Sequence, residues 1–182
     1  MVNSNKKGKR GEREVVKLLK DWWGGDFSRT PDSGAFMTTH AQVLVESGSD
    51  LGGDIITPPD FPFSVEVKLR KEIDLWEPVR IETPTEDQSL TKDNPITWYY
   101  QAKYDASRFG KIPLVIMKEN RKQWYCILPY DFKPYHNSDI PCLVYKKMFY
   151  ICTYKKVCMY TKDEILMCVD VYRKDKDNGK LV

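Results

Sequence analysis

Two acidic residues and a lysine are spaced in a way that could support hydrolytic chemistry. Asp54 lies in an apolar run, Gly53–Thr57, and Glu66 and Lys68 lie in a second run that begins at Phe63. Strand side chains alternate with a period of two, so Glu66 and Lys68 point to the same face. Carboxylate oxygens suit a hard divalent cation such as Mg²⁺, and a neighbouring lysine can orient a water or help deprotonate it. This stretch is therefore a candidate for a metal-dependent hydrolytic site.

The same pattern also has a simple structural interpretation. A Glu-x-Lys triplet arises by chance about once in a chain of this composition. Asp131-Phe132-Lys133 is a second acid-x-Lys triplet, and it lies between prolines with no upstream strand that carries an acid. Glu66 and Lys68 could equally form a surface ion pair beside a half-buried strand. The spacing alone leaves both interpretations open.

The elements that would position these side chains come first in the chain. Glu12–Trp23 has apolar residues at helical spacing, and Gly24-Gly25 ends the predicted helix. An acid such as Glu12 in a first helical turn is also an ordinary complement to the helix dipole. Phe27–Thr30 is a short predicted strand, followed by a turn and a long polar segment, 35–52. The runs on either side of Pro58-Pro59-Asp60 are predicted to form a hairpin, which brings Asp54 close to Glu66.

The second half of the chain predicts more strands around one helix. Asn94 and Pro95 start a helix that Gly110 ends, and residues 113–117 and 123–128 read as a buried strand and its hairpin partner. Leu75 and Trp76 are expected to anchor the irregular segment before that helix. Residues 143–160 suggest two or three short strands. Thr161–Glu164 is a capping-box pattern that favours a terminal helix, although 169–172 is almost as strand-like, and a frayed tail is expected from about 173. The order predicts an α/β protein with a mixed central sheet flanked by helices.

Composition limits the class of protein. The chain has 182 residues, 41% hydrophobic and 30% charged, which is ordinary for one compact domain. No run is apolar enough to span a membrane, and the polar N-terminus does not resemble a signal peptide. Five cysteines without zinc-site spacing indicate reduced thiols in a cytoplasmic protein. The net charge of +3 is small, but residues 1–11 form a basic arm suited to phosphates, or else a solvated tail.

Taken together, these segments resemble the PD-(D/E)XK nuclease superfamily, and most closely its archaeal-type Holliday-junction resolvases. The matching segments, in chain order, are Lys7–Leu19, Phe27–Gly34, Gly53–Ile56, Val65–Lys68 and Arg108–Val115. They span residues 6–128. A glycine precedes the aspartate where a proline is usual, the segment before Asp54 is longer than in a minimal resolvase, and residues after about 129 have no counterpart there.

The resemblance implies a restriction-endonuclease-like core in residues 1–128 and a C-terminal β-rich extension in 129–182 packed on that core. It implies Glu12, Asp54, Glu66 and Lys68 as the catalytic set. Asp54, Glu66, the Val67 carbonyl and Glu12 would bind Mg²⁺, for which Mn²⁺ would substitute. The residues expected to contact DNA are Lys9, Arg10, Arg13, Arg29, Ser33 and Gln101.

The implied activity is a Mg²⁺-dependent endodeoxyribonuclease that leaves a 5′-phosphate and a 3′-hydroxyl. Its implied substrate is a four-way DNA junction, resolved by paired nicks from a homodimer whose surface includes residues near Trp76 or Trp98. Two alternatives stay open. One is a restriction-type or repair endonuclease of the same fold that acts on duplex or flap DNA. The other is a DNA-binding module without catalysis.

Overall fold

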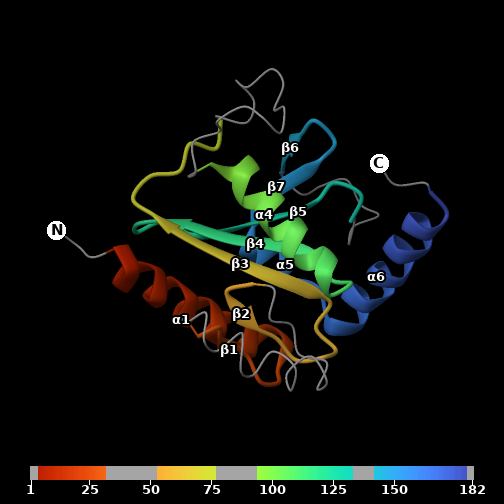
Figure 1. Ribbon diagram of the computed structural model, residues 1–182, viewed down its shortest axis with the longest axis horizontal. Coiled ribbons are helices and arrows are strands. Elements are labelled where there is room, and N and C mark those ends of the chain that lie inside the picture. The colour runs from red at the N-terminus through yellow and green to blue at the C-terminus, as the bar shows by residue number, and fades with distance from the viewer. Residues whose placement is uncertain (1–3, 32–52, 77–93, 133–141, 180–182) are drawn as a thin grey trace.

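A five-stranded mixed sheet forms the centre of the protein. The computed structural model describes residues 4–31, 53–76, 94–132 and 142–179. The strands, in spatial order, are β3 (Phe63–Arg70), β4 (Ile112–Glu119), β5 (Trp124–Pro129), β7 (Phe149–Thr153) and β6 (Leu143–Tyr145). β3 and β4 are parallel, and the other neighbours are antiparallel. The predicted α/β class, with a mixed sheet between helices, is confirmed (Figure 1).

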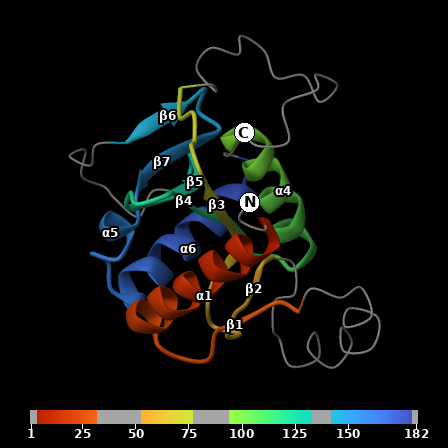
Figure 2. The same cartoon turned by 90° about the vertical axis from the view of Figure 1, so that its left-hand side faces the viewer.

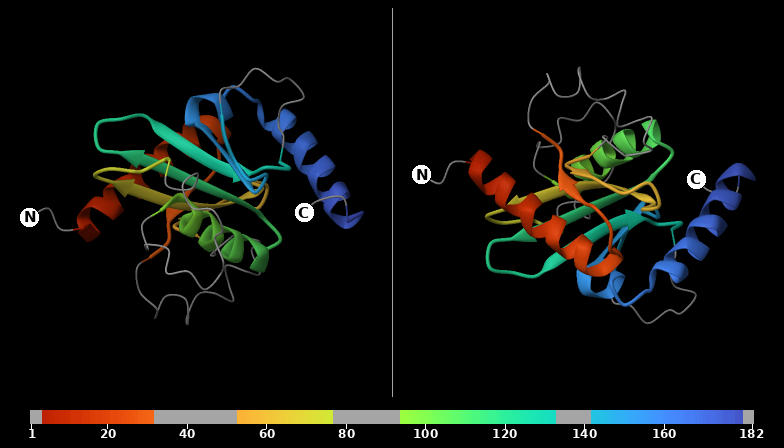
Figure 3. Two further views of the ribbon diagram at one scale, coloured as in Figure 1. Left: turned by 90° about the horizontal axis from the view of Figure 1, so that it is seen from above. Right: turned by 90° about the horizontal axis from the view of Figure 1, so that it is seen from below.

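Alternating apolar side chains give the sheet two buried faces. In β4, Leu114 and Ile116 belong to one apolar cluster, and Val115 and Met117 belong to the other. The first cluster includes side chains of α1 (Ser4–Trp23), α5 (Tyr154–Val157) and α6 (Lys162–Asp177), and the second includes those of α4 (Pro95–Arg108). Figure 3 shows α4 on one side of the sheet and α1 on the other. A nearly continuous apolar run is what a strand covered on both faces requires.

Helix α4 begins and ends where its sequence predicts. The Asn94 side chain accepts a hydrogen bond from the Thr97 N–H at 2.9 Å, and Pro95 occupies the first turn. Gly110, just after the helix, has φ +62°, a conformation that favours glycine. Of the predicted buried face, Tyr99, Ala102 and Ala106 are buried, while Phe109 is only half-buried.

Helix α1 begins at Ser4, eight residues before the predicted start, so the prediction of an arm over residues 1–11 is wrong from Ser4 onward. The glycines in this region made a helix improbable from propensity alone. Tertiary packing reverses that preference at Gly11, which is buried. A Cβ there would lie 3.0 Å from the Cβ of Leu69. The absent side chain lets α1 approach β3 closely, and Figure 2 shows α1 in front of the sheet.

The predicted hairpin between the Asp54 and Glu66 segments is wrong in its pairing. β2 (Ile55–Ile56) pairs with β1 (Ser28–Arg29) in a separate two-stranded ribbon, and β3 pairs with β4. The Asp54 N–H still donates to the Val65 carbonyl at 2.9 Å, so the two segments are adjacent. A hairpin ladder needs longer paired strands than the two residues of β2. The prolines between the two runs also have no N–H to donate to such a ladder.

The C-terminal segment continues the same sheet. β6 and β7 form a hairpin whose second strand pairs with β5, and the capping box at Thr161 and Glu164 starts α6. The strand alternative at 169–172 and the frayed tail from 173 are both wrong, because α6 runs to Asp177. Whether residues 129–182 form a distinct extension stays a prediction. All five cysteines are free thiols.

Two tryptophans also differ in role. Trp98 is buried, and Trp76 is 62% exposed. Leu75 packs against the second apolar cluster, so the predicted anchor of this segment is Leu75 and not Trp76. A dimer surface near either tryptophan stays a prediction. Among the described residues, no helix has the length and apolarity to cross a membrane.

Candidate active site

Backbone contacts fix Asp54 beside β3. The Thr30 N–H donates to the Asp54 carbonyl at 2.9 Å, and the Thr30 hydroxyl donates to the Gly53 carbonyl at 2.7 Å. A Cβ at residue 53 would lie 2.3 Å from the Val65 carbonyl oxygen, so only glycine fits there. The Asp54 carboxylate then accepts a hydrogen bond from the Val67 N–H at 2.7 Å. Asp54 thus reaches the strand that carries Glu66, as predicted, although not through a hairpin.

Glu66 and Lys68 lie on the face of β3 that α4 covers. The Lys68 ammonium forms an ion pair with Glu66, and their side chains are only 13% and 4% exposed. The interpretation as a surface ion pair is therefore wrong, because both groups are largely removed from water. A buried pair is a weak source of stability, because desolvation offsets much of the attraction. The arrangement calls for a functional explanation.

Burial disfavours the charged form of both carboxyl groups. Burial, followed by the charge of Asp54, raises the pKa of Glu66 to about 7, against the opposing effect of Lys68. Burial also raises the pKa of Asp54, while the Val67 N–H and then Lys68 act to lower it. Two acids that resist ionisation side by side are typical of catalytic and metal-binding sites.

Glu12 approaches this group from α1. Its carboxylate accepts a hydrogen bond from the Arg29 Nε at 2.5 Å, and the two side chains are 15% and 21% exposed. The charge of Glu12 contributes to the raised pKa of Asp54, which places it near that group. An acid that only complemented the helix dipole would need no such partner. Glu12 and Arg29 are therefore part of the same constellation.

Helix α4 contributes side chains to the site from the face of the sheet that it covers. The Lys68 Nζ lies 3.3 Å from the Gln101 Oε1, and the charge of Asp105, one turn further on, raises the pKa of both Asp54 and Glu66. Sequence reasoning identified Gln101 and missed Asp105. The signal was available, because residues four apart share a helix face and Gln101 had already been predicted to contact DNA.

The remaining predicted DNA contacts are spread along α1 or lie outside the described residues. Arg10 and Arg13 are exposed on α1, and Arg10 also pairs with Glu14 at 3.4 Å. Lys9 is half-buried on the same helix. Ser33 falls in the segment 32–52, outside the described residues. The structure therefore brings Gln101 and Arg29 to the site directly and leaves Arg10 and Arg13 exposed on α1.

The donor set fits a hard divalent cation. Asp54 and Glu66 supply carboxylate oxygens, and their mutual repulsion is what a cation between them would relieve. Among the described residues, no three His, Cys, Asp or Glu side chains form a ready metal-binding group. Glu12 is held by Arg29 and Glu66 by Lys68, so the four predicted metal ligands are neighbours rather than a formed cage.

A mixed sheet that brings an aspartate, a Glu-x-Lys strand and a helical glutamate together defines the PD-(D/E)XK class of nucleases. The chain belongs to the family described as "Phage putative PDDEXK endonuclease", which matches residues 3–174. It is also 30% identical over 131 residues to Protein D14 of Escherichia phage T5, a match that covers 70% of this chain and 71% of that protein. No solved structure matches. The superfamily prediction is confirmed.

Proposed function

We propose that this nuclease is a Mg²⁺-dependent endodeoxyribonuclease whose reaction takes place at Asp54, Glu66 and Lys68. The observation that carries the proposal is a pair of buried carboxyl groups, both with raised pKa, beside a buried lysine, where the charge of Asp54 adds to the effect of burial on Glu66. Such a pair disfavours its own ionised state unless a cation shares the site. Membership of an endonuclease family supports the same chemistry.

Each side chain has a distinct role in this proposal. Asp54, Glu66 and the Val67 carbonyl would hold the metal, and Glu12 would contact it directly or through water. A bound Mg²⁺ would lower the pKa of a water and stabilise charge on the scissile phosphate. The Lys68 Nζ, positioned by Glu66 and Gln101, would orient the attacking water. Arg29, already fixed by Glu12, would bind a neighbouring phosphate.

The products would be a 5′-phosphate and a 3′-hydroxyl. We propose branched DNA as the substrate, with the four-way junction as the first candidate because of the resemblance to resolvases. Two symmetric nicks require two active sites, so a two-fold homodimer is the economical assembly. The basic α1 surface near the site supports binding to the DNA backbone, which weakens steeply as salt rises.

A substrate panel tests this proposal. Equal concentrations of a labelled four-way junction, a flap and a linear duplex are incubated with the protein, with Mg²⁺, with Mn²⁺ and with EDTA. The proposal predicts nicks only with a divalent cation, and paired symmetric nicks in the junction. Equal cleavage of all three substrates would favour a restriction-type or repair enzyme. Binding without any nicking would favour a DNA-binding module.

A further inference from the structure

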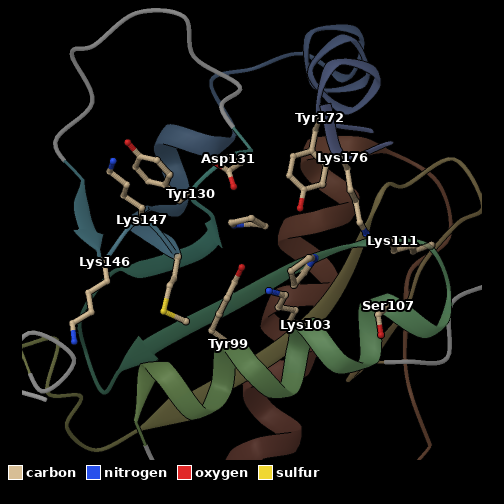
Figure 4. A pocket seen from close by; sticks show the side chains of 13 residues that line it. Tyr99, Lys103, Ser107, Lys111, Tyr130, Asp131, Lys146, Lys147, Tyr172 and Lys176 are labelled. Atoms are coloured by element: carbon tan, nitrogen blue, oxygen red, sulfur yellow. The ribbon is translucent and has the colours of Figure 1, made fainter. Parts of the chain in front are cut away.

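A basic and aromatic cavity lies on the opposite flank of α4 from the active site. Its volume is about 520 Å³, which is within the range of sites that hold one small ligand. Its walls come from α4, the start of β4, the end of β5, the β6–β7 turn and the end of α6. Figure 4 shows this cavity with the side chains that line it.

The charge of the cavity favours an anion. Five lysines line it, and the acid among the lining residues is Asp131. Lys103 comes from α4 and Lys176 from α6, so distant parts of the chain contribute positive charge to one place (Figure 4). Lys111 also donates to the Thr57 hydroxyl at 2.6 Å, which fixes its position at the rim. Lysines from separate elements around one concavity are suited to phosphate groups.

Tyrosines add a second chemical property. Tyr99, Tyr130 and Tyr172 line the same cavity, and the hydroxyls of Tyr99 and Tyr172 point into it from opposite sides (Figure 4). Tyr172 is held in place by an edge-on contact with Phe132, with ring centroids 5.8 Å apart. Tyr99 is only 3% exposed, so it presents its hydroxyl to the cavity, whereas Tyr130 and Tyr172 are partly exposed. Aromatic rings of this kind beside lysines are the combination by which proteins bind single strands, because bases stack and phosphates pair with cations. A duplex is too wide to enter a cavity of this size.

The turn between β6 and β7 carries two of these lysines at a conformational cost. Lys146 and Lys147 have φ +43° and +56°, and the Met148 N–H closes the turn onto the Tyr145 carbonyl at 2.7 Å. Such turns favour Asn-Gly, because side chains other than glycine resist positive φ. The two lysines place positive charge at the rim of the cavity, although the conformation of the turn favours other residues at both positions.

Helix α4 connects this cavity to the active site. Gln101 and Asp105 face the site, and Tyr99, Lys103 and Ser107 face the cavity, each set at a spacing of four residues. Tyr104, on the outer surface of α4, is 68% exposed. A helix with its side chains is about 10–12 Å across, a distance that a few nucleotides span.

We propose that this cavity binds an unpaired DNA strand where it leaves the duplex held at the active site. The inference rests on the proposed function, because it takes DNA as the substrate. Among branched substrates it favours those with an unpaired strand, such as a flap, over the fully paired four-way junction. The strand would cross α4 near Tyr104 and place its phosphates on the cavity lysines.

Binding of a fluorescent oligothymidylate of about eight nucleotides to the full chain in EDTA tests the cavity without any nuclease reaction. Lys103→Ala/Lys176→Ala should weaken binding about tenfold and lower the slope of log affinity against log salt by about 1.4. The matched control is Lys20→Ala/Lys174→Ala, which removes the same charge from exposed positions on α1 and α6. Equal effects of the two double variants would overturn the proposal.

The turn provides a second variant whose folding is not in question. Lys146→Asn/Lys147→Gly should raise the melting temperature by about 2–4 °C, because the turn conformation is relieved. The same variant should bind the oligonucleotide more weakly than the wild type. A more stable protein with unchanged affinity would show that these lysines serve no ligand.

Competition identifies the ligand, and cleavage separates this inference from the proposed function. Oligothymidylate should compete far better than inorganic phosphate, thymidine monophosphate or a hairpin duplex of equal length. Equal competition by phosphate would show that the cavity binds anions in general. Equal competition by duplex would show that it does not prefer unpaired strands. Either result would overturn the proposal. The Lys103/Lys176 variant should still cut a fully paired four-way junction at the wild-type rate, while Asp54→Asn should bind oligothymidylate normally.

Discussion

Replacing Glu66 with glutamine should stabilise the metal-free protein at alkaline pH. Glu66 is buried beside Asp54, and these two causes raise its pKa to about 7 from an ordinary value of 4.5. Glutamine has nearly the same shape and carries no charge at any pH. A substitution that removes a central catalytic group should therefore strengthen the fold, which is the signature of a site built for function.

The magnitude follows from the linkage between protonation and folding. Between pH 4.5 and 7 the folded protein holds the Glu66 proton and the unfolded chain releases it, so stability falls as pH rises through this window. The difference corresponds to about 3 kcal/mol at pH 8. Lys68 loses its ion pair in the variant, so the expected gain is about 1–3 kcal/mol at pH 8 and near zero at pH 5.

Thermal unfolding in EDTA at pH 5 and pH 8 measures this difference. A gain of this size raises the melting temperature by about 3–10 °C at pH 8. Glu72→Gln is the matched control, because that side chain lies two residues after β3, is 80% exposed and should change stability little. Excess Mg²⁺ should stabilise the wild type and reduce the advantage of the variant. A Glu66→Gln protein no more stable than wild type at pH 8 would refute the reasoning.

Three further substitutions test the supports of the site. Gly53→Ala should destabilise the fold by about 2 kcal/mol or more and abolish cleavage, because its Cβ would lie 2.3 Å from the Val65 carbonyl oxygen. Denaturant unfolding measures the loss of stability, and a nicking assay measures the loss of cleavage. Arg29→Ala should slow cleavage about tenfold or more by releasing Glu12, whereas an unchanged rate would exclude this role. Asp105→Asn should lower the pKa of both buried acids, so Mn²⁺ binding followed by calorimetry should persist to lower pH, and an unshifted pH profile would contradict that.

Much of the site could be predicted because its signals are local. The alternation in β3 places Glu66 and Lys68 on one face, and the cap at Asn94 sets the register of the helix that brings Gln101 to Lys68. These features depend on spacing within one element. Sequence therefore identified the elements and the orientation of their functional side chains.

The errors concern preferences that tertiary contacts override. Residues 4–11 are helical because Gly11 allows close packing on Leu69, and propensity does not record that contact. The pairing of β2 with β1 depends on Thr30, which is distant in sequence from Asp54. The burial of Glu66 follows from the position of α4 over the sheet, so the choice between a surface ion pair and a site required the fold.

Nicking of DNA by Asp54→Asn, beside wild type, tests the central claim most directly. Asp26→Asn, at an exposed position before β1, is the control for loss of one acid. Wild type and Asp26→Asn should nick a labelled branched DNA with Mg²⁺ and not with EDTA, while Asp54→Asn should bind it equally in Ca²⁺ and leave it intact. Nicking by Asp54→Asn at the wild-type rate, or by wild type in EDTA, would contradict the assignment.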